Sequence, residues 1–310
     1  MTTFERPLAG LSISLSISES EDSEKYGFPL WQVNRTALQM VSAFFGQGIS
    51  VVFGHDWRDD GVMEAVYSLA QQMQVPIPLS PEEAEVTNQP LMRNILPWPD
   101  EPRLKQAEIE QLASTLRIER AGLPDELRPF EIQALEEKKS PIYFYLRARG
   151  LTFLRHKLNQ ESNARLCIGG RRSGSQGRYP GIIEEALLTV TGHKPLYLAG
   201  VLGGATQQII DAIEGKEMPE NFCPSPGNNL VHIYQSPPIR PQNLEYNADC
   251  TIDRESVWET FKKVGIKKIA ETNGLTQEEN KELFHTPVIE EVIKFVLIGL
   301  SRLNAESVTR

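Results

Sequence analysis

The sequence contains little cysteine, no long apolar run and no excess of positive charge. Its three cysteines, Cys167, Cys223 and Cys250, lie far apart and form no CxxC pair, which argues against a disulfide framework and against a zinc site. No stretch approaches the roughly 20 apolar residues of a membrane-spanning helix, and the first residues lack the charged-then-apolar order of a signal peptide. We therefore expect a cytoplasmic protein without a membrane span, a bound metal or a cofactor.

Acidic residues outnumber basic residues by 41 to 32, which gives a formal net charge of −9. This charge disfavours a general electrostatic contact with nucleic-acid phosphates or with an anionic membrane surface. A protein that handles DNA would need an extended basic face with aromatic stacking residues. Nucleic acid is therefore a disfavoured partner, although a local basic site is compatible with the charge.

The order of the predicted elements is typical of an α/β protein. Residues 10–17 alternate small polar with aliphatic residues, and 49–53, 164–168 and 194–198 are short apolar stretches, so all four segments are predicted to be strands. Alternation of strands and helices at short spacing favours a doubly wound Rossmann-like fold, a mostly parallel sheet with helices on both faces. The predicted helices that alternate with these strands cover 34–45, 62–73, 182–191 and 205–213.

The chain divides into two predicted parts. Residues 1–215 form a Rossmann-like domain, in which the proline- and charge-rich segment 76–140 is interpreted as a partly irregular insertion. Residues 216–310 form a C-terminal helical extension that ends in the strongly apolar helix 287–303. Such a helix is buried either against its own domain or in an oligomer interface, and we favour its own domain.

The strongest candidate site is the segment 169–185, GGRRSGSQGRYPGIIEE, between a predicted strand and a predicted helix. Its glycines let the backbone approach an anion closely, the start of the helix adds a positive dipole end, and its arginines supply paired donors suited to phosphate. A flexible surface loop with incidental arginines is the alternative. The predicted ligand-binding residues here are Gly169, Gly170, Arg171, Arg172, Gly174, Arg178, Pro180 and Gly181.

A second candidate site is the segment 54–61, GHDWRDDG, also between a strand and a helix, where open α/β sheets bind ligands. Its aspartates can accept hydrogen bonds from ribose hydroxyls or simply cap the helix. Trp57 is a candidate for stacking on a base, and no histidine pair with metal-ligand spacing accompanies the aspartates. The predicted ligand-binding residues here are Gly54, His55, Asp56, Asp60 and Gly61, and a later glycine-rich turn adds Gly203 and Gly204.

These segments resemble the SLOG superfamily. This Rossmann-like group includes the Lonely Guy (LOG) cytokinin-activating phosphoribohydrolases, the DprA-type DNA-processing proteins and nucleotide sensors of bacterial defence systems. Ser18 and Glu19 are similar to the small loop that ends the first strand of LOG enzymes, which implies a ligand contact. Gly54 and the run 61–63 are similar to the turn after their second strand.

The glycine-rich loop extends the resemblance and also departs from it. Arg155, fourteen residues before Gly169, is similar to the helix arginine of LOG enzymes, and Gly181 and Glu185 have the spacing of their Pro-Gly-Gly-x-Gly-Thr-x-x-Glu motif. The chain inserts RRSGSQGRYP and replaces the motif threonine with Ile182. The altered pattern resembles a SLOG branch of bacterial defence gene clusters. The likeness covers residues 10–213.

The resemblance implies a nucleotide-derived ligand. SLOG sensors bind a second messenger such as an ADP-ribose isomer, and binding changes their oligomeric state. The enlarged, arginine-rich loop suits two or more phosphates, and the acidic surface elsewhere would direct an anionic ligand to it. We therefore favour an ADP-ribose- or NAD-like ligand and a sensor or effector of antiphage defence. A homo-oligomer and a TIR- or Sir2-type partner protein are also implied.

An enzymatic function stays open as the alternative, a nucleotide N-glycosidase of the phosphoribohydrolase type. Cleavage of the glycosidic bond passes through an oxocarbenium-like sugar, which needs a nearby carboxylate to stabilise charge or activate water. Glu185 is the candidate, Glu184 is the adjacent alternative, and Arg155 would hold the phosphate or orient the leaving group. Because successive helical residues point about 100° apart, only one of the two glutamates can face the site.

Overall fold

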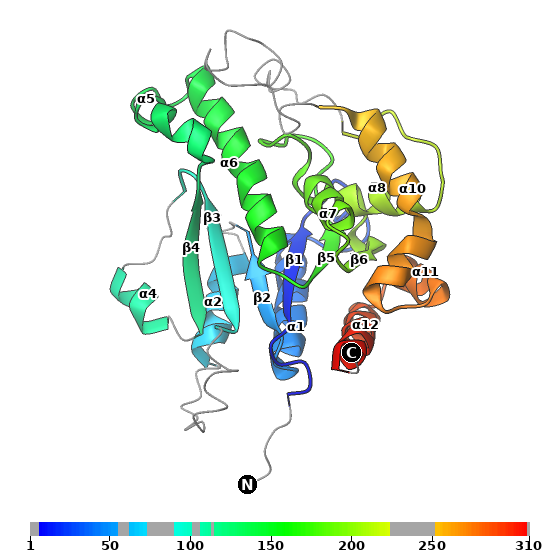
Figure 1. Cartoon of the computed structure of the whole chain (residues 1–310). Helices are drawn as coiled ribbons and strands as arrows, with labels where there is room; N and C mark the ends of the chain where they lie inside the picture. The colour runs from blue at the N-terminus through cyan, green and yellow to red at the C-terminus, as the bar shows by residue number, and fades with distance from the viewer. Residues whose placement is uncertain are drawn as a thin grey trace.

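The computed structural model describes residues 6–54, 62–72, 90–100, 106–112, 115–223 and 252–308. In this part of the chain, six strands form one parallel sheet in the order β4-β3-β2-β1-β5-β6 (Figure 1). This arrangement confirms the predicted doubly wound α/β fold. The strands are β1 (Ser12–Ser18), β2 (Ser50–Phe53), β3 (Met92–Pro97), β4 (Leu116–Gly122), β5 (Ala164–Gly169) and β6 (Leu196–Ala199).

Helices cover both faces of the sheet. The first half of the chain supplies α1 (Leu30–Gly46), α2 (Val62–Gln72), α4 (Gln106–Leu112), the 3-10 turn η1 (Asp125–Phe130), α5 (Glu131–Glu136) and α6 (Pro141–Gln160). The second half supplies α7 (Gly181–Thr191), η2 (Gly200–Leu202), α8 (Gly204–Ile213), α10 (Arg254–Asn273), α11 (Gln277–His285) and α12 (Ile289–Val308). None of the helices in the described segments has the length and apolar character that a membrane span requires.

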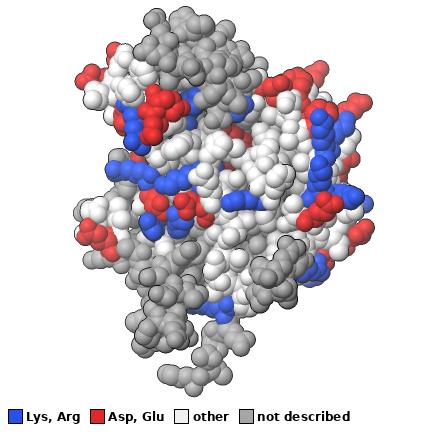
Figure 2. Space-filling model, viewed as in Figure 1, with Lys and Arg blue, Asp and Glu red and all other residues white. Residues whose placement is uncertain are grey.

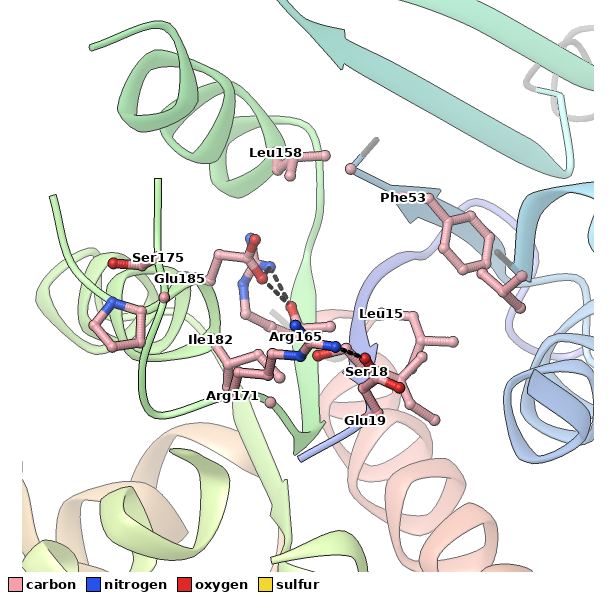
Figure 3. Close-up of a pocket in the computed structure, with 18 of the residues that line it drawn as sticks. Leu15, Ser18, Glu19, Phe53, Leu158, Arg165, Arg171, Ser175, Ile182 and Glu185 are labelled. Carbon is pink, nitrogen blue, oxygen red and sulfur yellow. Dashed lines mark hydrogen bonds and ion pairs between the residues drawn. The ribbon is translucent and has the colours of Figure 1, made fainter. Parts of the chain in front are cut away.

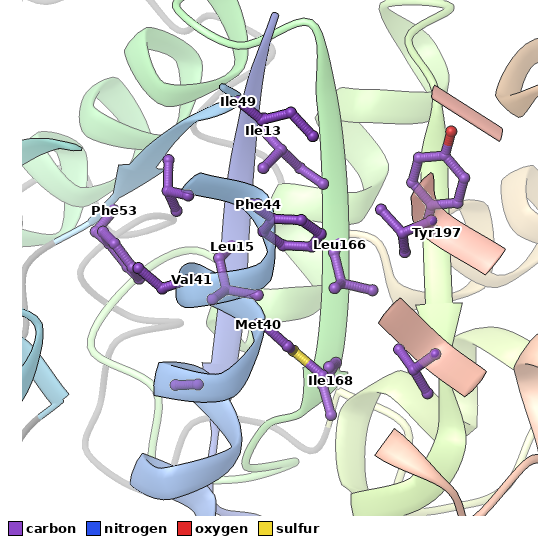
Figure 4. Packing of buried hydrophobic residues seen from close by; sticks show 14 of the residues in the cluster. Ile13, Leu15, Met40, Val41, Phe44, Ile49, Phe53, Leu166, Ile168 and Tyr197 are labelled. Atoms are coloured by element: carbon purple, nitrogen blue, oxygen red, sulfur yellow. The ribbon is translucent and has the colours of Figure 1, made fainter. Parts of the chain in front are cut away.

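The central strand β1 alternates serine with aliphatic residues, and this alternation separates the two faces of the sheet. Ile13 and Leu15 belong to the buried apolar cluster on the α1 face. Figure 4 shows Met40 and Phe44 of α1 beside the side chains of β1 and β5. On the opposite face, Ser14 donates a hydrogen bond to the carbonyl of Leu158 in α6 at 3.3 Å. Because strand side chains alternate between faces, one strand lines both an apolar core and a polar layer.

The segment 76–140 contributes two strands to the central sheet, where the sequence analysis assigned only a partly irregular insertion. β3 pairs with β2, and β4 pairs with β3 at the edge of the sheet. The strands are hard to recognise because they carry charges: Arg93 of β3 donates to Glu119 of β4 at 2.7 Å. An edge strand faces solvent along one side, so β4 lacks the apolar run of a central strand.

The C-terminal helix α12 packs against its own chain. Its buried residues Val292, Val296 and Leu300 belong to the same apolar cluster as Phe44 of α1 and Leu166 of β5. This is the packing favoured by the sequence analysis for helix 287–303. The start of α12 is set by Thr286, whose hydroxyl accepts a hydrogen bond from the N–H of Val288 at 3.2 Å. The helices after residue 252 therefore share a core with the sheet.

Candidate functional site

A cavity of about 350 Å³ opens at the carboxyl ends of the central strands. β1 and β5 are neighbours here. The strands that follow β1 in the chain extend the sheet on one side, and the strand that follows β5 extends it on the other, so the strand order reverses between β1 and β5. Ligands of open α/β sheets bind at such a switch point. Figure 3 shows the lining. The lining residues are Leu15, Ser16, Ile17, Ser18, Glu19, Val52, Phe53, Gly54, Val62, Leu158, Arg165, Gly170, Arg171, Ser173, Gly174, Ser175, Pro180, Gly181, Ile182 and Glu185.

Glu185 presents a carboxylate to this cavity from the first turns of α7. Its Oε2 accepts hydrogen bonds from Arg165 Nη1 at 3.0 Å and from the hydroxyl of Ser16. Its Oε1 lies 3.9 Å from Arg155 Nε and accepts no hydrogen bond from the described residues. One carboxylate oxygen is therefore held by two hydrogen bonds, and the other has only the longer ion pair with Arg155 among the described residues.

Arg165 is a charged residue on the central strand β5 and is only 1% exposed. Besides Glu185, it contacts Ser16 through Nη1 at 2.7 Å and Thr189 through Nε at 3.0 Å. Its Nη2 has no hydrogen-bond partner in the described part of the chain. Buried charges persist in proteins when they are paired, and the contact with Arg165 fixes the position of the Glu185 carboxylate.

Glu184 points away from the cavity into the protein interior, where it is 2% exposed. Its Oε1 accepts a hydrogen bond from Thr152 at 2.6 Å, and its Oε2 accepts one from Arg155. The two carboxylates leave α7 in different directions, as the angle between successive helical residues requires. Arg155 contacts both of them, since its Nη1 donates to Glu184 and its Nε lies 3.9 Å from Glu185 Oε1. Of the three predicted catalytic residues, only Glu185 lines the cavity; Glu184 and Arg155 form a buried pair behind it.

The guanidinium of Arg155 packs against the backbone of the glycine-rich loop at Gly177 and Gly181. A Cβ atom on Gly177 would lie 2.4 Å from Arg155 Nη1, and one on Gly181 would lie 3.1 Å from Nη2. Glycine at position 177 therefore permits the loop to lie directly on the guanidinium. Arg155 thus contacts the loop and, through Glu185, a residue that lines the cavity.

The N-terminus of α7 forms one wall of the cavity. Pro180 is the N-cap residue, and its side chain makes no capping hydrogen bond. Gly181 and Ile182, the first residues of the helix, line the cavity. Free N–H groups and the positive end of the helix dipole make such a terminus a favourable place for an anion.

The arginines of the loop are matched by carboxylates from the segment 19–22. Arg171, which lines the cavity, contacts Glu19 (Figure 3), and Arg172 contacts Asp22 through two hydrogen bonds at 2.8 and 3.1 Å. Arg178 lies over the ring of Tyr179 at 5.0 Å and does not line the cavity. Figure 2 shows basic groups adjoining acidic groups among the described residues on the face in view.

Gly203 and Gly204 form the start of α8, which receives a carboxylate of the protein itself. Both have positive φ angles, 63° and 65°. The N–H of Gly204 donates to Asp22 Oδ2 at 3.0 Å. Burial raises the pKa of Asp22, but the hydrogen bonds from Gly204 and Arg172 outweigh it, and the pKa is lowered. The first N–H of α8 is therefore bonded to a carboxylate of the protein itself. Neither glycine lines the cavity.

The structure brings together part of the predicted site and adds residues that the sequence analysis missed. The predicted residues that line the cavity are Ser18, Glu19, Gly54, Gly170, Arg171, Gly174, Pro180, Gly181 and Glu185. Those that lie elsewhere are Arg155, Gly169, Arg172, Arg178, Glu184, Gly203 and Gly204. His55, Asp56, Trp57, Asp60 and Gly61 fall outside the described residues. Arg165 and Ser16 were missed, and the signal for Arg165 was a charge inside an otherwise apolar strand.

Potential metal ligands and thiols were sought among the residues that the structure describes. No three His, Cys, Asp or Glu side chains are arranged to hold a metal ion in the segments that the structure describes. Burial raises the pKa of the Cys167 thiol to about 12, with a smaller opposing effect of Arg165. A thiol with this pKa remains protonated near neutral pH and is a poor nucleophile.

Comparisons with known proteins identify the family. A search of curated proteins and a search of solved structures found no similar protein. The family model described as SLOG cluster2 matches residues 7–283, which include all six strands and the lining of the cavity. The SLOG family points to a nucleotide-related function for a Rossmann-like fold. The chain belongs to the SLOG cluster2 family.

Proposed function

We propose that the protein binds a nucleotide-derived, phosphate-bearing ligand of the ADP-ribose or NAD type in this cavity. The observation that carries the proposal is that the N-terminus of α7 and the Glu185 carboxylate lie on one cavity wall, and that the N-cap residue Pro180 supplies no capping hydrogen bond. Glu185 lies four residues after Gly181, a rise of about 6 Å along the helix. A ribose phosphate can place its phosphate at the N-terminus and its hydroxyls at Glu185 Oε1.

The remaining lining suits the other parts of a nucleotide. Val52, Phe53, Val62 and Leu158 offer apolar surface for a base. Arg171 lies at the cavity and can reach a second phosphate. The cavity volume of about 350 Å³ falls in the range of roughly 300 to 1,000 Å³ that is common for small-molecule sites.

Recognition of the ligand, rather than its hydrolysis, is the function that we favour. The arginine that resembles the helix arginine of LOG enzymes is Arg155, and it pairs with Glu184 behind the cavity. Arg155 does not line the cavity, and its guanidinium faces the two glutamates of α7, so we expect it to position these carboxylates rather than to hold a ligand phosphate. As part of the proposal, the protein is a homo-oligomeric sensor or effector of bacterial antiphage defence that acts with a TIR- or Sir2-type partner.

Hydrolysis of an N-glycosidic bond is the second candidate function. It is favoured by one observation: Glu185 lines the cavity with an oxygen that accepts no hydrogen bond from the described residues. A carboxylate beside the ribose can stabilise an oxocarbenium-like sugar or activate water. In that case, Arg165 would hold the carboxylate in position.

The two functions are distinguished by incubating the protein with adenosine monophosphate, NAD, ADP-ribose and cyclic ADP-ribose isomers. We expect ADP-ribose or an isomer to raise the melting temperature and to be recovered unchanged by chromatography. Release of a free base would instead support the hydrolase. Absence of both stabilisation and turnover with every compound would contradict the proposal.

The variant Glu185→Gln tests the position of the ribose. We expect a loss of nucleotide affinity of roughly tenfold, since a hydrogen bond to a charged group contributes about 1.5 kcal/mol. Isothermal titration with ADP-ribose measures the change. Glu24→Gln is the matched control, because Glu24 is exposed and does not line the cavity. Equal nucleotide affinities of the two variants would show that Glu185 does not contact the ligand.

A further inference from the structure

The segment 19–22 supplies carboxylates to donor groups at residues 171–173 of the glycine-rich loop, of which Arg171 and Ser173 line the cavity. Glu21 accepts hydrogen bonds from the backbone N–H of Arg172 at 3.0 Å and from the Ser173 hydroxyl at 3.3 Å. Its second oxygen lies 3.5 Å from Arg172 Nε. A backbone N–H, a hydroxyl and a guanidinium are the donors that phosphate sites use, so the Glu21 carboxylate occupies a place suited to a phosphate.

Glu19 makes a second contact of this kind, with the guanidinium of Arg171. Arg171 and Glu19 both line the cavity (Figure 3), so this ion pair lies at the cavity wall. One member of each pair reaches solvent: the Arg171 side chain is 64% exposed against 24% for Glu19, and the Glu21 side chain is 36% exposed against 22% for Arg172. Ion pairs open to solvent contribute little to stability, so another anion can compete with these carboxylates.

Asp22 differs from Glu19 and Glu21 because it is held by two separate parts of the chain, the glycine-rich loop and the start of α8. It accepts two hydrogen bonds from the Arg172 guanidinium and one from the N–H of Gly204. These contacts tie the segment 19–22 to α8 and to the glycine-rich loop. The segment can therefore release its two glutamates without leaving its position.

We propose that Arg171, the Arg172 N–H and Ser173 form a second anion subsite that Glu19 and Glu21 fill in the ligand-free protein. This inference rests on the proposed function and specifies the ligand class. A ligand with a pyrophosphate group places one phosphate at the α7 N-terminus and displaces the glutamates with the other. A nucleoside monophosphate fills only the first position. The internal carboxylates thus select for ligands that carry two adjacent anionic groups.

The test compares adenosine monophosphate, ADP-ribose and inorganic pyrophosphate as probes of the wild-type protein and of the double variant Glu19→Gln, Glu21→Gln. Removal of the competing charges should raise the affinity for ADP-ribose and for pyrophosphate by roughly fivefold, the scale of exposed ion-pair effects. The affinity for the monophosphate should change by less than about twofold. Isothermal titration gives the three dissociation constants.

Two further variants keep the result interpretable. Glu24→Gln removes a neighbouring charge that makes no contact with the loop arginines in the described chain, and it should leave all three affinities unchanged. Adding Arg171→Ala to the double variant should cancel the gain for ADP-ribose. Melting temperatures confirm that each variant is folded.

The outcomes separate the inference from the proposed function. Nucleotide binding with no gain, or with a loss, in the double variant overturns the second subsite and leaves the proposed function intact. A gain for pyrophosphate without nucleotide binding supports the subsite and contradicts the proposed function. An equal gain for the monophosphate and ADP-ribose overturns the selection for two anionic groups. No binding of any probe overturns both.

Discussion

Arg165 and Glu185 show how single residues define the candidate site. Arg165 stands on a buried strand, where a charge is costly unless it is paired. Its guanidinium meets the Glu185 carboxylate at 3.0 Å, and the Ser16 hydroxyl shares the contact. The result is a carboxylate with a fixed position at the cavity wall. Glu184, one residue earlier, serves the packing of Arg155 instead.

Arg165→Met should destabilise the protein by about 3 kcal/mol, because it leaves the Glu185 carboxylate without its buried partner. The urea dependence of unfolding measures the loss. Arg117→Met is the control: its side chain is 61% exposed, and its removal should change the stability by less than about 0.5 kcal/mol. Adding Glu185→Leu to Arg165→Met should recover part of the loss, and no recovery would argue against this pairing.

At the scale of elements, the starts of α7 and α8 are used differently. Both follow a strand of the sheet through a glycine-containing loop. The α8 terminus receives the Asp22 carboxylate at the Gly204 N–H. The N-cap residue of α7, Pro180, supplies no capping hydrogen bond, and the first residues of α7 line the cavity. An internal carboxylate thus occupies the α8 terminus, whereas the α7 terminus is where we propose that a ligand phosphate binds.

Gly204→Ala should destabilise the protein by about 3 kcal/mol or more, because a backbone shift must relieve the contact. A Cβ atom at this position would lie 2.3 Å from the carbonyl oxygen of Gly170, and the φ angle is 65°. Thermal or urea unfolding measures the effect.

Gly174→Ala is the matched control for the backbone conformation. Its φ angle is 71°, but a Cβ atom there would have no neighbour within 4 Å. Only the cost of a left-handed conformation remains, about 1 to 2 kcal/mol. Equal losses in the two variants would show that the close contact of Gly204 is unimportant.

At the scale of the whole molecule, the parallel sheet and the C-terminal helices share one core. The family match continues from the sheet through α10 and into α11, which agrees with this shared packing. The predicted boundary at residue 215 stays a prediction. α12 joins the cluster that contains α1 and the central strands, so the C-terminal helices contribute to the stability of the sheet that carries the site.

Stability of the whole protein should fall in acid, because several carboxyl groups have lowered pKa values in the fold. Burial raises the pKa of Glu119, but Arg93 outweighs it and the net pKa is lowered. The same balance with Gly204 and Arg172 lowers the pKa of Asp22. A lowered pKa in the folded state adds stability above the ordinary values of 4.5 and 3.8, and this stability disappears as the pH falls below them.

Unfolding free energies between pH 7 and pH 3 test this acid dependence. Glu119→Gln and Asp22→Asn should each flatten the acid limb of the curve, since each variant removes a group that takes up a proton on unfolding. Glu255→Gln on the exposed side of α10 serves as the control. If the curve of Glu119→Gln runs parallel to that of the wild type, Glu119 does not have a lowered pKa in the folded protein.

Much of the fold follows from local patterns, but two strands do not. The predicted strand 10–17 and helix 182–191 correspond to β1 and α7 within two residues. β3 and β4 were missed because their charges look like those of a surface loop. In the structure, Arg93 and Glu119 pair across the two strands, so their charges are compatible with a sheet edge. A pairing between strands is invisible in either segment alone.

The sequence by itself determined the α/β fold, the strand-loop-helix context of the segment 169–185, and the spacing that places Glu185 on α7. These are local properties, since periodicity and glycine positions act over a few residues. Only the tertiary structure decided which charges face the cavity. Arg171 and Arg172 meet carboxylates about 150 positions earlier in the chain, and Arg165 meets Glu185 across a buried layer. Charge pairing depends on distance in space, and the fold sets that distance.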